Sequence, residues 1–338
     1  MPALITASRR GLECAAGGFC IDPMRPSDLA LITHAHADHA RRGAARYIAA
    51  RDSVPILRQR LGEDQHIDAV DYGEPIRLGA TTVSFHSAGH VLGSAQIRIE
   101  RDGELWVASG DFKRDNDPTC APFEVVPCDV FITEATFALP VYRWPPAGEV
   151  AREILEWWQA NQRAGRPSVL FSYAFGKAQR VLAELAPLTN QPAYVHGAVQ
   201  TITELYRDAG VTMLETIPVD GRERRDYAGE LVIAPPGAAG SRWMRRFKGA
   251  QTGFCSGWMR VRGNRRRRGF DRGFVLSDHA DWPSLLATIE EVGAKRVLTT
   301  HGHSDTLVRL LRERGVDAAE LDLRPLEGDE DVADAAVH

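Results

Sequence analysis

Four side chains that can bind a metal ion lie within six residues, directly after the apolar run Leu29-Ala30-Leu31-Ile32. They are His34, His36, Asp38 and His39. Residues two apart do not share a helix face, so the first three converge only in a tight loop that leaves a strand. Imidazoles with a carboxylate are the ligands of catalytic first-row metal sites. The sequence therefore predicts a metal-binding loop after a buried strand, and a histidine-rich surface loop is the alternative.

The length and composition of the chain are those of an ordinary globular protein. Its 338 residues allow one large or two medium domains, and 44% are hydrophobic and 25% charged. No apolar run approaches the length of a membrane span and no signal segment begins the chain, so we expect a cytoplasmic protein without a membrane partner. The five cysteines are odd in number and lack a Cys-x-x-Cys pair, which argues against a disulfide framework or a thiolate zinc site.

The net charge of −4 hides one strongly basic segment. Residues 241–272 hold eleven Lys or Arg and one acid, so the remainder of the chain carries −14. A concentrated basic segment in an otherwise acidic chain predicts a polyanionic partner. The alternative is a solvated, charged surface loop.

Two further candidate ligands follow predicted strands. Thr81 to His86 alternates with period two, and the small-residue segment after it contains His90. The segments Gln96–Glu100 and 104–109 flank an Asp-Gly turn, which indicates a hairpin, and the second of them leads to Asp111. We expect His90 to be a third histidine ligand and Asp111 to be able to bridge two cations.

The rest of the chain alternates between predicted helices and strands. Alanine and arginine predict helical character from Ala40 to Arg51, and apolar spacing predicts a helix from Ala147 to Ala164. A strand at 168–172 precedes a helix that opens at Gly176, whose positive end would favour anions together with Lys177. A helix from Ser284 to Val292 and then a strand complete the pattern.

These motifs resemble the metallo-β-lactamase fold, and later residues narrow the resemblance to its β-CASP branch. The His-x-His-x-Asp-His string is followed by Glu134 at the end of an apolar strand and then by an inserted segment. The segments 255–265 and 272–282 resemble the bacterial ligase-associated DNA exonucleases of this branch. Ribonuclease J, the pre-mRNA cleavage endonuclease and the cross-link repair nucleases are relatives of that family. The match covers nearly the whole chain.

The resemblance implies an α/β fold, a metallo-β-lactamase αββα sandwich with an inserted β-CASP α/β domain. The expected first part is 1–139, the insertion is 140–255 and the second part is 256–326. Residues 327–338 are acidic with little apolar material, and we expect them to form a disordered tail.

The resemblance also implies two divalent metal ions, Zn2+ or Mn2+. The first ion would be held by His34, His36, His90 and Asp111. The second ion would be held by Asp38, His39, Asp111 and His301. Asp22, which closes an early strand, would steady the metal loop. The implied catalytic residues are Asp38, Glu134 and His279, with His279 placed by Glu134 so that it contacts the scissile phosphate or protonates the leaving oxygen.

The expected function is that of a metal-dependent DNA exonuclease, acting on single-stranded DNA in end processing for repair and linked to a DNA ligase and a helicase. The expected nucleic-acid contacts are Lys177, Ser256, Gly257, Arg262, Arg265, Arg266, Arg267 and Arg268. Within the class, a β-CASP ribonuclease is the alternative, because ribonucleases of the family carry a histidine in the place of His301. From another class, the alternative is a catalytically silent nucleic-acid-binding module.

Overall fold

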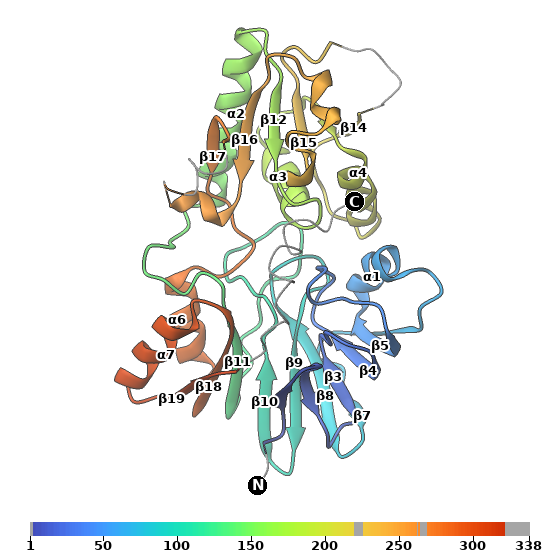
Figure 1. The fold of residues 1–338 in the computed structure, drawn as a ribbon, viewed down its shortest axis with the longest axis vertical. Coiled ribbons are helices and arrows are strands. Elements are labelled where there is room, and N and C mark those ends of the chain that lie inside the picture. Colours follow the sequence, from blue (N-terminus) through green and yellow to red (C-terminus); the bar gives the residue numbers. More distant parts are fainter. Residues whose placement is uncertain (1–2, 220–225, 262, 264–268, 322–338) are drawn as a thin grey trace. The chain divides into compact units, whose positions relative to one another are not determined.

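The computed structural model describes residues 3–219, 226–261, 263 and 269–321, and these form two compact units (Figure 1). The first unit contains the chain up to Tyr142 and again from His279 onward. The second unit is the segment from Arg143 to Asp278. The second unit is therefore inserted into the sequence of the first.

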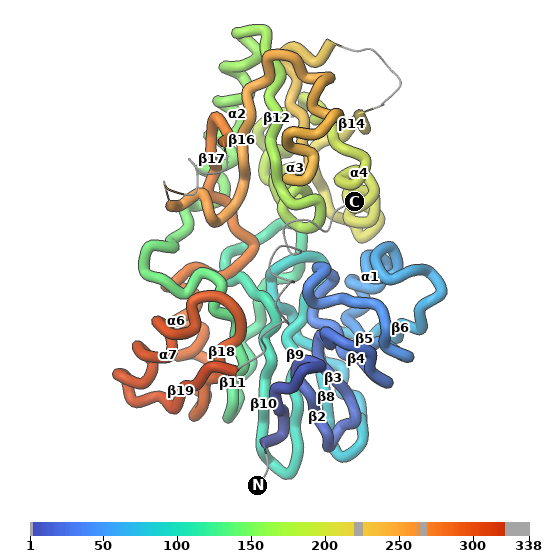
Figure 2. Tube along the Cα trace, in the orientation of Figure 1, coloured from blue at the N-terminus to red at the C-terminus, as the bar shows by residue number. Residues whose placement is uncertain are grey.

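The first sheet of the first unit has six strands in the order β1-β2-β3-β4-β5-β6 (Figure 2). Their bounds are β1 Thr6–Ser8, β2 Gly11–Cys14, β3 Phe19–Ile21, β4 Ser27–Ile32, β5 Ala44–Ala50 and β6 Ile67–Val70. The strands from β3 to β6 pair in parallel. The short 3-10 helix η1 (Arg51–Ser53) leads into α1 (Val54–Leu61), which packs against β6.

The second sheet has seven strands in the order β19-β18-β11-β10-β9-β8-β7. Their bounds are β7 Ile76–Leu78, β8 Thr81–Ser87, β9 Ala95–Arg101, β10 Glu104–Ala108, β11 Val130–Ala135, β18 Arg296–Gly302 and β19 Asp317–Glu320. Side chains from both sheets, including Ile21, Leu31, Phe85 and Ile97, form one buried core. The helices α6 (Trp282–Glu291) and α7 (Ser304–Glu313) cover the other face of the second sheet through a separate core (Figure 1). The unit is a sandwich of two sheets.

The inserted unit is built on a parallel sheet with the order β14-β13-β15-β12-β16-β17. Its strands are β12 Ser168–Phe171, β13 Ala193–Val195, β14 Thr216–Pro218, β15 Leu231–Ala234, β16 Gln251–Cys255 and β17 Arg272–Phe274. The helices α2 (Ala147–Arg163), α3 (Lys177–Leu185) and α4 (Gly197–Asp208) share a core with one face of this sheet. The 3-10 helices η2 (Pro236–Ala238), η3 (Arg242–Arg246) and η4 (Gly257–Arg260) lie over the other face.

The structure departs from the sequence-based expectations at two places. The segment expected to be helical from Ala40 to Arg51 instead contains the strand β5, because it pairs with β4 and β6 on either side and buries Tyr47 to Ala50. Tertiary pairing thus overrides the helix propensity of alanine. The inserted unit continues to Asp278 rather than ending at 255, since β17 pairs with β16 in its sheet. The expected tail at 327–338 lies outside the described residues.

No described helix combines the length and the apolar composition that crossing a bilayer requires.

Candidate metal centre

The histidine-rich loop follows β4 and is held by the carboxylate of Asp22, which stands directly after β3. The backbone N–H of Thr33 donates to Asp22 Oδ1 at 2.8 Å, and the Thr33 hydroxyl donates to Oδ2 at 2.5 Å. The Nδ1 atom of His39 also lies 2.8 Å from Asp22 Oδ2. One carboxylate therefore fixes both ends of the loop, which is the position expected for Asp22.

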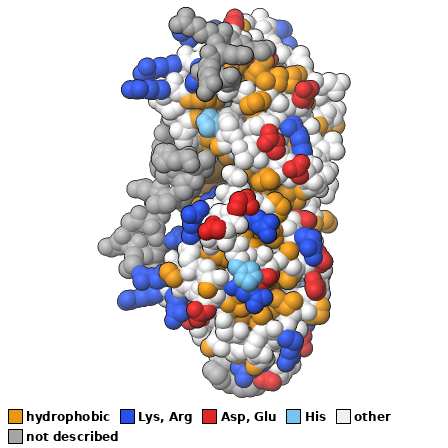
Figure 3. All heavy atoms as spheres, turned by 90° about the vertical axis from the view of Figure 1, so that its right-hand side faces the viewer, with side chains coloured by type: hydrophobic (Ala, Val, Ile, Leu, Met, Phe, Trp, Pro, Cys, Tyr) orange, Lys and Arg blue, Asp and Glu red, His pale blue; other side chains and the backbone are white. Residues whose placement is uncertain are grey.

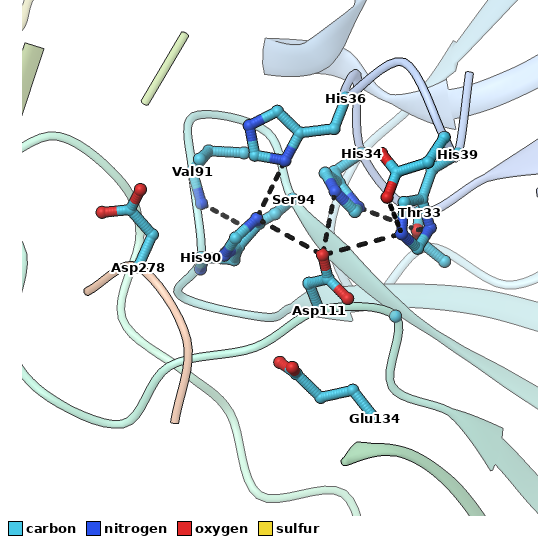
Figure 4. Close-up of polar contacts among 12 residues, drawn as sticks. Thr33, His34, His36, His39, His90, Val91, Ser94, Asp111, Glu134 and Asp278 are labelled. Carbon is cyan, nitrogen blue, oxygen red and sulfur yellow. Dashed lines mark hydrogen bonds and ion pairs between the residues drawn. The ribbon is translucent and has the colours of Figure 1, made fainter. Parts of the chain in front are cut away.

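Four ligand atoms from three different loops converge at one end of the sandwich (Figure 4). The ligand atoms of His34, His36, His90 and Asp111 all lie within 4.8 Å of one another. Asp111 Oδ2 lies 3.5 Å from His34 Nε2 and 3.7 Å from His90 Nε2. His90 Nε2 is also 3.1 Å from His36 Nδ1. The residues expected to hold the first metal ion are thus brought together.

The chemistry of this cluster fits a divalent cation. His34 is fully buried, and its Nε2 has no hydrogen-bond partner among the described residues. A buried polar atom without a partner costs free energy, so native structures rarely keep one. Burial, together with His39 and His36, lowers the pKa of His34 well below its usual value, so the imidazole is neutral. A neutral ring nitrogen that faces a carboxylate is a metal donor.

Asp111 also faces a second group of candidate ligands. His39 Nε2 lies 3.6 Å from Asp111 Oδ2 and 3.7 Å from Asp38 Oδ2. Burial raises the pKa of Asp111 to about 7, although His39 opposes this effect. Although burial also opposes ionisation of Asp38, the adjacent His39 and His36 lower its pKa to about 2. The same Asp111 oxygen therefore approaches His34, His90 and His39, as a bridging ligand must.

His301, the last expected ligand, lies at the end of β18. Its ring centroid is 6.1 Å from that of His39, which is farther than the spacings inside the four-residue cluster. Its φ angle is 53°, a left-handed conformation that is unusual for a residue other than glycine. Such strain costs on the order of 1–3 kcal/mol and clusters at functional sites. The left-handed backbone conformation therefore supports a functional role for His301, independently of its being a histidine.

Glu134 and His279 form a second close group with Asp111. Glu134 is the penultimate residue of β11 and is almost fully buried. Its Oε2 lies 2.8 Å from His279 Nδ1, and its Oε1 accepts the Phe112 N–H at 2.8 Å. The His279 ring is 4.7 Å from that of His90. The backbone is fixed as well, because Ala280 N–H donates to Phe112 O at 2.6 Å. His279 therefore stands beside the metal cluster with its orientation set by Glu134.

Two supporting residues were missed by the sequence analysis. Thr33 links Asp22 to the loop, and its Oγ1 lies 3.1 Å from His34 Nδ1. The hydroxyl of Ser94 accepts the N–H groups of His90 at 3.0 Å and of Val91 at 3.2 Å. The sequence offered only their position as a signal, because Thr33 directly precedes His34 and Ser94 lies four residues after His90. Small hydroxyl residues at such places can bond to backbone groups.

The residues expected to contact nucleic acid are either buried or lie outside the described residues. Lys177 does begin α3, but its side chain is 5% exposed and its ammonium lies 2.7 Å from Asp278 Oδ2. It is therefore committed to a buried ion pair instead of being presented to solvent. Ser256 and Gly257 are buried, and the Ser256 side chain caps η4. Arg262 and Arg265 to Arg268 lie outside the described residues.

The two-sheet unit, its His/Asp cluster and the inserted parallel sheet define the class of the molecule: the chain has the metallo-β-lactamase fold with an inserted β-CASP domain. No family model matches the chain. A probable DNA ligase from Opitutus terrae is 31% identical to it over 311 residues, which are 91% of this chain and 30% of that protein. Ribonuclease TTHA0252 from Thermus thermophilus is 28% identical over 218 residues, which are 56% of this chain and 48% of that protein.

A solved structure also shares the fold. The crystal structure of a protein of unknown function from Enterococcus faecalis V583 matches with a TM-score of 0.58 and 12% identity, over 89% of this chain and 80% of that one. The chain spans about a third to a half of the length of the two curated relatives named above.

Proposed function

We propose that this protein is a metal-dependent phosphodiesterase that cleaves nucleic acid. One observation carries the proposal: four ligand atoms, two of them from buried histidines, lie within 4.8 Å of one another, and the Glu134–His279 pair adjoins them through Asp111. A metal cluster alone would also suit a small-molecule hydrolase of this fold. The inserted domain and the basic segment at 241–272 have a use in nucleic-acid binding and no obvious use in such a hydrolase.

Two ion-binding sets share Asp111. In this proposal His34, His36, His90 and Asp111 hold one cation, and Asp38, His39, Asp111 and His301 hold the other. When bound, divalent cations in such donor sets lower the pKa of a water molecule towards about 7 and polarise a phosphoryl oxygen. The carboxylates of Asp38 and Asp111 only partly offset the charge of two Zn2+ or Mn2+ ions, so the site is electropositive and suits an anionic phosphodiester.

His279 is the proposed acid of the reaction. Glu134 engages its Nδ1 atom at 2.8 Å, so Nε2 is the ring nitrogen that would donate to a phosphate oxygen or to the leaving oxygen. The negative charge of Glu134 stabilises the protonated imidazole that this role requires. Asp22 and Thr33 hold the loop that presents His34 and His39, and so contribute by positioning.

The favoured substrate is single-stranded DNA, degraded from an end during repair. In support, the relative that aligns over 91% of this chain is named a probable DNA ligase, and the aligned part is less than a third of that longer protein. Fusion to a ligase in one polypeptide would couple end processing to end joining. The proposal therefore includes a functional link to a DNA ligase, and it extends to a helicase and to action in the cytoplasm. Ribonuclease activity is the second candidate, because a relative is named a ribonuclease and His301 matches the ribonuclease pattern.

The substrate class is tested by a time course on single-stranded DNA and RNA of identical sequence, labelled at either end, with Mn2+ or Zn2+. The variant His34→Ala serves as the control for a contaminating nuclease. Stepwise shortening of DNA that is absent from the variant is the expected result, and the end from which label leaves gives the polarity. Faster cleavage of RNA than of DNA would contradict the proposed DNA substrate and support the ribonuclease candidate.

If the metal-loaded protein cleaves neither DNA nor RNA, the result would contradict the enzyme proposal and favour a catalytically silent binding module.

A further inference from the structure

One long stretch of the inserted unit contains no acidic residue. Residues 231–270 hold ten Lys or Arg and neither Asp nor Glu, although the whole chain has 45 acidic residues. Within this stretch, the described helix η3 and the residues after it carry Arg242, Arg245, Arg246 and Lys248. The positive charge of this stretch is therefore not offset by acidic residues within the stretch itself.

The packing of η3 fixes which of its side chains face solvent. Phe247 is buried in the core on that face of the sheet, and Trp243 and Met244 pack against the same core. Arg242, Arg245 and Lys248 are exposed. Because residues three apart are eclipsed in a 3-10 helix, Arg242 and Arg245 share one edge of η3, and Lys248 follows two residues after its end.

These three cations are not neutralised by acidic side chains in contact with them. Among the described residues, none of the three forms an ion pair, whereas Arg51 pairs with Asp71 and Arg309 with Glu313. Acidic and basic side chains are interspersed on the face drawn in Figure 3. Other cations with acidic partners include Arg46, Arg98, Arg101, Arg114, Lys295 and Arg296. Other exposed cations, such as Arg58 and Arg143, also lack an acidic partner among the described residues, so the η3 segment is distinguished by the absence of acidic residues from 231–270.

An aromatic ring lies within the same short segment. Trp243 is half-buried, and its ring contacts His196 at 5.0 Å and Phe247 at 4.7 Å between centroids. These two neighbours, together with the core beneath, hold the indole in one place. The Arg246 guanidinium donates to Trp243 O at 3.2 Å and so helps to fix the same turn. Cations beside a fixed aromatic ring are the combination with which proteins bind single-stranded nucleic acid.

We propose that η3 is an accessory binding surface for a single-stranded nucleic acid. Arg242, Arg245 and Lys248 contact successive phosphates, and the indole of Trp243 contacts a base. The inference rests on the proposed function only for the class of ligand, and it requires no contribution from the metal ligands. The surface adds affinity that depends on strand length and salt and little on sequence.

The test is the salt dependence of binding, measured by fluorescence anisotropy with a labelled single-stranded DNA in the presence of EDTA, so that the probe stays intact. The variant replaces Arg242, Arg245 and Lys248 with Gln. A matched control replaces Arg51, Arg296 and Arg309 with Gln, which removes the same charge from exposed residues that have acidic partners. Each lost phosphate contact reduces the slope of log K against log salt by about 0.7, so the first variant should lose about 2 and the control nothing.

An unchanged slope in the η3 variant, or an equal loss in the control, would overturn the proposal. A parallel assay separates this surface from the proposed function: hydrolysis of bis(p-nitrophenyl) phosphate with Mn2+ requires the metal centre and no strand binding. If the η3 variant shows a reduced slope and the wild-type protein hydrolyses no diester, the proposed enzymatic function is rejected and the proposed binding surface is supported. Hydrolysis with an unchanged slope would reject the surface alone.

Discussion

At the scale of single residues, Glu134 has the proposed role of positioning His279, and the variant Glu134→Gln tests it. Although burial opposes it, the neighbouring His279 lowers the pKa of Glu134, so the side chain is a buried carboxylate beside an imidazole. The amide keeps the shape and removes the charge that stabilises protonated His279. We expect kcat to fall about 100-fold to 10000-fold, the usual contribution of a general acid, while bound metal stays constant.

Metal analysis decides between two roles for Glu134, because its carboxylate also lies in a close group with Asp111 and His279. Loss of metal from Glu134→Gln would make it a ligand and contradict the positioning role. His279→Ala is the matched control, and it should reduce kcat to a similar extent with full metal content.

Lys177 illustrates a second residue-scale prediction. Its ammonium and the Asp278 carboxylate are both about 5% exposed and 2.7 Å apart. Lys177→Met would leave a buried carboxylate without this partner, and breaking a buried pair in this way costs about 3–5 kcal/mol. The free energy of unfolding from urea titration measures the loss, and the double variant Lys177→Met/Asp278→Leu should recover part of it. A nearly unchanged stability with weaker nucleic-acid binding would instead restore the phosphate-contact role expected from the sequence.

At the scale of elements, the turn between β10 and Asp111 depends on glycine. Gly110 has φ +57°, and a Cβ atom there would lie 2.7 Å from Thr33 Cβ. Gly103 in the β9–β10 turn has φ +82°, with nothing within 4 Å of its Cβ position. Alanine at either position costs about 1–2 kcal/mol for the left-handed backbone, but only Gly110→Ala also displaces Thr33 or Asp111.

We therefore expect Gly110→Ala to lose more stability than Gly103→Ala and to bind metal more weakly. Thermal unfolding and metal content of the two variants check this difference. Equal losses in both would show that the loop after β10 tolerates the extra methyl group.

The elements also show what sequence alone could predict. The loop at His34 to His39 was predictable because its spacing is incompatible with a helix, and the β9–β10 hairpin because Asp-Gly favours one turn. The strand β5 was not, since Ala44 to Ala50 carries no period-two pattern and becomes a strand only through its two neighbours. The ion pair of Lys177 was not predictable for the same reason, because its partner Asp278 is 101 positions away. Long-range partners of this kind leave no local signal.

At the scale of the whole molecule, the proposed metal ligands all belong to the first unit. Ion binding should therefore stabilise that unit selectively, by about 2.7 kcal/mol when free metal is 100 times its Kd. Hydrogen exchange with and without EDTA measures this by segment. Peptides from β4 and β10 should lose protection when metal is removed, and peptides from β12 and β15 should not. Equal loss in both sets would place metal-dependent order outside the first unit.

The proposed role of Asp111 as a ligand shared by two ions is tested by the number of metal ions bound per chain. Mass spectrometry of the wild-type protein should give about two ions per chain, Asp111→Ala close to none, and His90→Ala and His301→Ala about one each, as two sites that share one carboxylate require. Full metal content in Asp111→Ala, or a single ion in the wild-type protein, would contradict the shared-ligand centre on which the proposed chemistry depends.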